Sequence, residues 1–169
     1  FYENPLPYQK LDALGLPALS AERVIPSIIV GNSGYPTNNH LDAVDYLIRN
    51  NVRANLRIPV SYGDKRYVEF LKKKFADYPF GTVEFIDRYM GFDEYLNFLK
   101  DSDALIMNNI RPQGYGNVFM MLYLGKPVFL NGNNISLPDL EKNGIMTNDW
   151  AELKSTINVS FAERNKRAI

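Results

Sequence analysis

The loop Arg111-Pro112-Gln113-Gly114-Tyr115-Gly116-Asn117 lies between two short apolar runs, 104–107 and 127–130, and leads directly into the apolar segment 118–124. This order predicts a strand, a glycine-bearing loop, a buried helix and a second strand. The glycines allow a sharp turn and leave backbone N–H groups exposed at the helix start, where the helix dipole favours anions. Arg111 adds a guanidinium, whose fork of donors fits phosphate. We therefore expect this loop to bind a diphosphate; an ordinary strand-to-helix turn is the alternative.

Strands and helices alternate along the rest of the chain. Ile28-Ile29-Val30 is apolar at successive positions, which is typical of a central strand covered on both faces. Thr37 or Asn38 is expected to cap the first helix, and Asp64 the second. Further strands are predicted at 25–30, 52–60, 83–86 and, at an edge, near 145–147. Helices are predicted around 41–48, 68–75, 92–99, 118–124, 137–140 and 149–157, with another beginning near 163–167. The alternation predicts an α/β fold with a doubly wound parallel sheet, a Rossmann-like arrangement.

The first part of the chain differs from the rest. Residues 1–24 contain Pro5, Pro7 and Pro17 and have no sustained hydrophobic period, which predicts an extended linker. We assign the folded domain to residues 25–169, a length typical of a single domain. Because the chain begins with Phe1 rather than methionine, we expect it to be a piece of a longer protein.

Composition narrows the class of function. Lysine plus arginine (19) balances aspartate plus glutamate (19), so the chain lacks the basic excess of a nucleic-acid-binding protein. It has no cysteine, which excludes disulfides, thiolate metal sites and a cysteine nucleophile. No apolar run approaches the roughly 20 residues that a membrane-spanning helix needs. The sequence therefore predicts a soluble globular domain without a nucleic-acid partner.

The predicted polar loops converge on one edge of the sheet. In doubly wound sheets, ligands bind beyond the carboxyl ends of the strands, where the strand order reverses. The predicted turns at 31–34, 61–63, 88–91, 108–116 and 131–134 all fall at that edge. The candidate substrate-binding residues are Gly31, Asn32, Ser33, Gly34, Asn38, Asn39, His40, Arg111, Gln113, Gly114, Tyr115, Gly116, Asn117 and Asn131. Asparagine is also common in turns for backbone reasons, which is the alternative interpretation of these side chains.

Several motifs together resemble a known family. Gly31-Asn32-Ser33-Gly34 followed by Asn38-Asn39-His40 resembles the bacterial 4-acetamido-4,6-dideoxygalactose (N-acetylfucosamine) transferases, in which GNSG precedes NNH at a helix start. Three further segments resemble motifs of that family. The family's FDxYLxxL helix is similar to Phe92, Asp93, Tyr95, Leu96 and Leu99. Its RQQGIG loop is similar to Arg111, Gln113, Gly114 and Gly116, and its GxPCVLN strand to Gly125, Pro127, Val128, Leu130 and Asn131. The resemblance covers about residues 28–134.

The resemblance implies a function and an architecture. These enzymes transfer N-acetylfucosamine from a dTDP-sugar donor to a lipid-linked saccharide, lipid II, in the synthesis of polysaccharides of the enterobacterial common antigen type. They have the GT-B fold, in which two Rossmann-like domains face each other and the C-terminal one holds the donor. The resemblance therefore implies that this chain is the C-terminal half, with the acceptor bound by the missing domain. It also implies peripheral association of the whole protein with the cytoplasmic face of the inner membrane.

Two departures from the family pattern concern the donor site. Pro112 stands where the family has glutamine, and Tyr115 where it has a smaller apolar residue, so the loop shape is expected to differ. Many GT-B enzymes carry a ribose-binding glutamate after the glycine loop. Here the helix offers Phe119-Met120-Met121 instead, and no ribose contact is assigned.

The same residues give expectations about catalysis. Asp101-Ser102-Asp103 resembles a metal-binding pair by its letters, but it lies where a helix should end, so we expect neither a metal nor another cofactor. Fixed donors, namely Arg111 and the loop amides, would then neutralise the leaving diphosphate. His40, the only histidine, is a candidate for a catalytic or a capping role. If the general base comes from the missing domain, this piece binds donor without turnover.

Two alternatives stay open at this point. One is another GT-B enzyme that uses a UDP-sugar, either a transferase or an epimerase. The other is a non-catalytic, flavodoxin-like regulatory domain; such a receiver needs acidic residues after its first strand, where this chain has Gly31-Asn32-Ser33. An NAD-type domain is disfavoured because GxGxxG is missing from the first turn.

Overall fold

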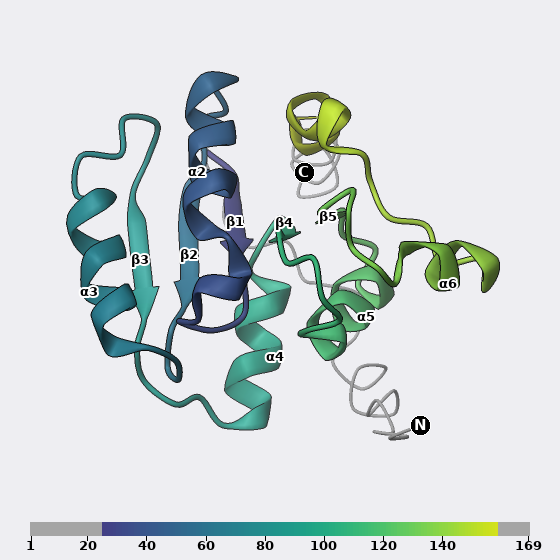
Figure 1. The fold of residues 1–169 in the computed structure, drawn as a ribbon, viewed down its shortest axis with the longest axis horizontal. Coiled ribbons are helices and arrows are strands. Elements are labelled where there is room, and N and C mark those ends of the chain that lie inside the picture. Colours follow the sequence, from purple (N-terminus) through teal and green to yellow (C-terminus); the bar gives the residue numbers. More distant parts are fainter. Residues whose placement is uncertain (1–24, 159–169) are drawn as a thin grey trace, which may run out of the picture.

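The centre of the molecule is a parallel sheet, seen in a computed structural model that describes residues 25–158. Its strands are β1 (Ser27–Val30), β2 (Asn55–Pro59), β3 (Val83–Ile86), β4 (Ala104–Met107) and β5 (Val128–Leu130). They are ordered β3-β2-β1-β4-β5, and every adjacent pair is parallel (Figure 1). As predicted, the fully buried β1 lies at the centre.

Helices cover both faces of this sheet. The α-helices are α2 (His40–Arg49), α3 (Lys65–Lys74), α4 (Phe92–Lys100), α5 (Tyr115–Tyr123) and α6 (Leu137–Lys142), and the 3-10 helices are η1 (Pro36–Asn38) and η2 (Trp150–Glu152). One apolar core joins the sheet to α2, α3 and the helical residues 153–158, and the other joins it to α4, α5 and α6. Successive β1 residues alternate between these cores, which confirms the predicted doubly wound α/β fold.

The helix starts confirm one predicted cap and correct another. Asp64 accepts hydrogen bonds from the amides of Arg66 (2.8 Å) and Tyr67 (3.2 Å), so it caps α3 as predicted. Neither Thr37 nor Asn38 caps α2, because both lie in η1. The N-cap is Asn39, in the left-handed region (φ 49°) that asparagine tolerates, and its side chain makes no cap hydrogen bond.

The last part of the described chain differs from the sequence prediction. Residues 145–147 form no strand; one isolated bridge joins Asn148 to Phe129 of β5. The predicted helix over 149–157 is present as η2 followed by helical residues 153–158. The predicted linker at 1–24 and the helix expected near 163–167 lie outside the described residues. Within residues 25–158, no helix combines the length and apolar character needed to cross a bilayer.

Candidate functional site

The loops after β1 and β4 begin side by side, because these two strands are neighbours in the sheet. From β1 the chain passes to β2 on one side, and from β4 it passes to β5 on the other (Figure 1). This is the reversal of strand order at which ligands bind in such folds. The loop of residues 31–39 and the loop of residues 108–114 therefore form the rim on which the candidate site is built.

Gly31 sets the direction of the β1 loop. Its φ of 73° lies in the left-handed region, and its N–H donates to the carbonyl of Ile106 in β4 at 2.8 Å. A Cβ placed on Gly31 would lie 2.6 Å from Nε2 of His40, so the backbone turns directly above the imidazole. Glycine is needed here for both reasons.

Asn38 holds the same loop from inside. Its side chain is fully buried, and its Nδ2 donates to the carbonyl (3.1 Å) and Oγ (2.9 Å) of Ser33 and to the carbonyl of Tyr35 (3.2 Å). Its Oδ1 accepts from the amide of Asn32 at 3.1 Å. Both ends of the amide are thus used within the loop, so the geometry gives Asn38 a loop-shaping role.

His40, the first residue of α2, is also fully buried. Its Nδ1 lies 3.4 Å from the hydroxyl of Tyr67, and among the described residues its Nε2 has no hydrogen-bond partner. Burial lowers the pKa of His40 from 6.5 to about 4 because the imidazolium would be desolvated. The ring is therefore neutral at physiological pH and lies beneath the loop.

The pKa of His40 can be checked without ambiguity because the chain has a single histidine. We expect its ring proton and carbon NMR signals to stay at the neutral position down to about pH 5. The folded-state pKa lies below that of an unfolded histidine, so the unfolded state binds the proton more tightly and stability is lost as pH falls from 6.5 towards 4. A titration midpoint near 6.5 in the folded protein would contradict the burial of this ring.

Gln113 joins the β4 loop to the β1 loop. Its Nε2 donates to Oδ1 of Asn32 at 2.9 Å and to Oγ of Ser33 at 3.3 Å, and its Oε1 accepts from the hydroxyl of Thr37 at 3.1 Å. Arg111 lies on the outside of this junction: its Nε donates to Oε1 of Gln113 at 3.2 Å and its Nη2 to Thr37 at 3.5 Å. The guanidinium is exposed and lies at the mouth formed by the two loops.

Three asparagines connect the loops after β1, β4 and β5. Asn39 Nδ2 donates to the carbonyl of Asn108 at 2.9 Å, and Asn108 Nδ2 donates to the carbonyl of Asn39 at 3.1 Å. Asn131 Nδ2 donates to Oδ1 of Asn108 at 2.8 Å. These bonds fix the relative positions of the three loops.

The start of α5 combines a glycine cap with a bare helix terminus. Gly114 is the N-cap, with φ 67°, and a Cβ there would lie 2.6 Å from Cε of Met107 and 3.0 Å from Cγ of Asn32. No side chain caps the helix and no acidic residue lies in its first turn. Gly116, by contrast, has open space around its Cβ position. The first amides of α5 therefore carry positive partial charge without a side-chain partner.

The other predicted residues of this helix bind neighbouring elements. The hydroxyl of Tyr115 donates to Oδ1 of Asn134 at 3.1 Å. The side chain of Asn117 forms a hydrogen bond with Tyr95 on α4. Burial raises the pKa of the Tyr95 hydroxyl. Both contacts position α5 against the rest of the rim.

Gly34 joins the β1 loop to the loop after β2. Its N–H donates to the carbonyl of Tyr62 at 2.8 Å, and it forms a parallel bridge with Gly63. Sequence reasoning missed Tyr62, whose hydroxyl accepts from Nδ2 of Asn32 at 3.1 Å, and Thr37, which contacts the side chains of the β4 loop. The signal for Tyr62 was its place in a predicted turn at the rim.

The acidic residues form no metal centre in the described part of the chain. Across residues 25–158, no three His, Asp or Glu side chains are grouped so that they could hold a metal ion. Asp101 is the C-cap of α4, and Oδ2 of the buried Asp103 accepts from the amide of Ser27 at 2.6 Å. The expected helix terminus at 101–103 is confirmed.

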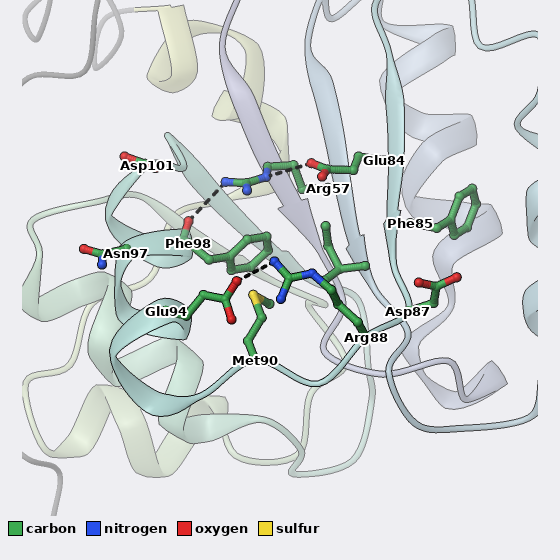
Figure 2. Close-up of a pocket in the computed structure, with 11 residues that line it drawn as sticks. Arg57, Glu84, Phe85, Asp87, Arg88, Met90, Glu94, Asn97, Phe98 and Asp101 are labelled. Carbon is green, nitrogen blue, oxygen red and sulfur yellow. Dashed lines mark hydrogen bonds and ion pairs between the residues drawn. The ribbon is translucent and has the colours of Figure 1, made fainter.

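A separate groove of about 270 Å³ lies between α4 and β3. Figure 2 shows that both arginines of this groove are paired: Arg57 lies 3.3 Å from Glu84 and 4.1 Å from the centre of the Phe98 ring, and Arg88 pairs with Glu94. The hydrogen bond from Arg88 lowers the pKa of Glu94. None of the predicted substrate-binding residues lines this groove, so we do not assign the site here.

Fold and rim together define a Rossmann-like domain, with polar loops meeting at the reversal of strand order. The chain belongs to the 4-alpha-L-fucosyltransferase family, glycosyl transferase group 56, which matches residues 13–164. The expected family and the class of glycosyltransferases are thereby confirmed.

The solved structures similar to this chain include the following two. AviGT4, a glycosyltransferase involved in avilamycin A biosynthesis, matches with a TM-score of 0.53 and 16% sequence identity over 86% of this chain and 47% of its own. The N-terminal domain of Candida albicans trehalose-6-phosphate phosphatase matches with a TM-score of 0.46 and 13% identity over 99% of this chain and 42% of its own. The first match supports the α/β fold. The chain spans less than half the length of either structure.

Proposed function

We propose that this domain binds the donor of a glycosyltransferase, a nucleotide sugar, with its diphosphate at the junction of the β1 and β4 loops. The observation that carries the proposal is that the exposed Arg111 guanidinium and the uncapped start of α5 belong to one rim, whose loops are tied together by Gln113. Fixed N–H donors and a guanidinium are the groups that stabilise a diphosphate as it leaves.

The identity of the donor and acceptor follows from the family likeness. We propose dTDP-N-acetylfucosamine as donor and a lipid-linked saccharide as acceptor, in the synthesis of a cell-surface polysaccharide. The chain would be the C-terminal half of a GT-B enzyme at the cytoplasmic face of the inner membrane, and the other half would bind the acceptor. Its match to 47% of AviGT4 is compatible with such a half.

The proposed mechanism needs no metal in this half. Charge on the leaving diphosphate would be neutralised by Arg111 and the first amides of α5. His40 would support the turn at Gly31 from below, because its ring is buried and neutral. The general base would come from the other half, so the isolated chain should bind donor without transferring sugar.

Calorimetric titration with dTDP tests this proposal. The wild-type chain should bind dTDP more tightly than UDP, and its affinity should be unchanged by EDTA. Arg111→Ala should weaken dTDP binding about tenfold, the effect of losing one charge-assisted contact. Arg53→Ala, a change of an exposed arginine just before β2 and at the opposite edge of the sheet, is the matched control and should leave the affinity unchanged.

Three outcomes would count against parts of the proposal. If Arg111→Ala bound dTDP as tightly as the wild type, the Arg111 guanidinium would not contact the diphosphate. Tighter binding of UDP than of dTDP would favour the alternative of a UDP-sugar enzyme. Sugar transfer by the isolated chain would show that the base lies within it.

A further inference from the structure

A second cavity, of about 310 Å³, opens beside the candidate donor site. It lies between the loop after β2, one face of α3 and the carboxyl end of β3, and its lining includes Tyr62, Val68, Glu69, Lys72 and Asp87. Its volume is at the lower end of the range found for small-molecule sites, about 300–1,000 Å³. It is therefore large enough for a single ring rather than for a whole nucleotide sugar.

The lining of this cavity includes an aromatic residue, Tyr62, whose side chain is held in a fixed position. Tyr62 is 56% exposed, yet its hydroxyl accepts a hydrogen bond from Asn32 at 3.1 Å and its carbonyl accepts one from the amide of Gly34 at 2.8 Å. The ring of Tyr35 packs edge-on against it, with 6.3 Å between the ring centres. An exposed apolar ring that is tethered at both its hydroxyl and its backbone loses little freedom when a ligand stacks on it.

The α3 side of the cavity carries charged hydrogen-bonding groups. Lys65, Glu69 and Lys72 recur at helical spacing and line the cavity from one face of α3. Lys72 Nζ lies 3.2 Å from Glu69 and 3.6 Å from Asp87 at the end of β3. The lining of the cavity thus combines ammonium donors and carboxylate acceptors with an aromatic residue.

This combination matches the chemistry of a pyranose. A hexose ring has an apolar face of C–H groups, which packs on an aromatic ring, and a belt of hydroxyls, which both donate and accept hydrogen bonds. A planar nucleobase would stack as well, but it offers fewer groups for the paired charges on α3. The shape and the polar groups together favour a sugar.

The position of Tyr62 connects this cavity to the donor site. Its hydroxyl contacts Asn32, the residue that also accepts a hydrogen bond from Gln113 at the proposed diphosphate site. Tyr62 also belongs to the lining of the cavity. A sugar in the cavity would therefore lie next to a diphosphate on the rim.

We infer that the cavity between Tyr62 and α3 is a pyranose-binding subsite, in which the ring stacks on Tyr62 and its hydroxyls bond Glu69 and Lys72. This inference rests on the proposed function, because the rim is taken to hold the nucleotide part of the donor. The pyranose is either the sugar that is transferred or a sugar of the acceptor. The chemistry is the same in both cases, and the experiment separates them.

The experiment uses three probes on the 169-residue chain: dTDP, dTDP-glucose and methyl α-D-glucopyranoside. If the subsite takes the donor's sugar, dTDP-glucose should bind about five- to tenfold more tightly than dTDP, the contribution of one aromatic contact. If it takes the acceptor's sugar, the glucoside should bind the dTDP-loaded protein, as seen by NMR. In either case Tyr62→Ala should abolish the binding that depends on the sugar, and Glu69→Gln should weaken it.

Matched variants keep the test interpretable. The contribution of the donor's sugar to binding is the ratio of the affinities for dTDP-glucose and dTDP within each variant. A change in the binding of dTDP itself therefore cancels. Glu69 is exposed, and its substitution should leave the thermal unfolding transition unchanged. Tyr62→Phe retains the stacking surface, so its ratio of dTDP-glucose affinity to dTDP affinity should stay close to that of the wild type. Tyr89→Ala changes an exposed tyrosine on another loop and should leave this ratio unchanged.

The outcome that overturns the inference is sugar binding that does not depend on Tyr62 and Glu69, or no sugar-dependent binding by either probe. Failure of the proposed function looks different: dTDP itself would not bind. In that case titration of the free protein with the glucoside still tests the subsite, because its dependence on Tyr62 and Glu69 can be measured without nucleotide.

Discussion

Replacing Gly63 by alanine is expected to lower the free energy of unfolding by about 3 kcal/mol, through backbone strain combined with overpacking. Gly63 has a φ of 136°, and a Cβ on it would lie 2.4 Å from the carbonyl carbon of Gly34 and 2.6 Å from its Cα. These are backbone atoms in a bridge that joins the β1 and β2 loops, where the amide of Asp64 also donates to the carbonyl of Gly34 at 3.1 Å. No flexible side chain can move to relieve the contact, so the two loops must separate. Urea unfolding followed by circular dichroism measures the loss.

Gly116→Ala provides the matched control for this prediction. It lies within the first turn of α5, and nothing approaches its Cβ position within 4 Å. Alanine favours a helix over glycine by up to about 1 kcal/mol, so this change should leave stability unchanged or raise it. A Gly63→Ala variant as stable as Gly116→Ala would mean that the loops are not held as closely as the bridge indicates.

The fold was predictable because its signals are local and repeated. Apolar runs such as Ile28-Ile29-Val30, separated by helical periods, define the alternation, and Asp64 marks a helix start by its own chemistry. The strand expected near 145–147 was wrong because its apolar residues do not pair: Met146 is 75% exposed, and only Asn148 reaches β5. A short apolar run cannot reveal whether a free strand edge is within reach.

The meeting of the predicted rim loops was also predictable, because the carboxyl ends of parallel strands must lie at one edge of the sheet. The orientation of individual side chains was not. Asn38 in the rim loop and His40 at the start of α2 are polar residues, yet both are fully buried, whereas Tyr62 lines a cavity. In an irregular loop, one residue more or less reverses the direction of a side chain. That direction is fixed by tertiary hydrogen bonds, such as those from Asn38 to Ser33, which leave no local pattern.

Asn38→Asp is expected to destabilise the domain by about 3–5 kcal/mol at neutral pH, the cost of breaking a buried polar network and leaving a charge in it. The Asn38 Nδ2 group is surrounded by three acceptors, the carbonyl and Oγ of Ser33 and the carbonyl of Tyr35. A carboxylate there would oppose those oxygens, whereas the amide donates to them. The asparagine side chain is fully buried, so water cannot compensate.

The pH dependence of the Asn38→Asp variant separates charge from lost hydrogen bonds. The fold would raise the pKa of the new carboxyl above its unfolded value of about 3.9, so the charge-dependent part of the penalty is absent below that pH and grows as pH rises. Asn38→Leu loses the same donors without gaining a charge, and its penalty should not grow with pH in this way. Asn133→Asp, at an exposed position in the β5 loop, should change stability little. Urea unfolding at acidic and neutral pH would contradict the assigned role of Asn38 if the Asp and Leu variants responded alike, because the network would then not depend on an uncharged donor at its centre.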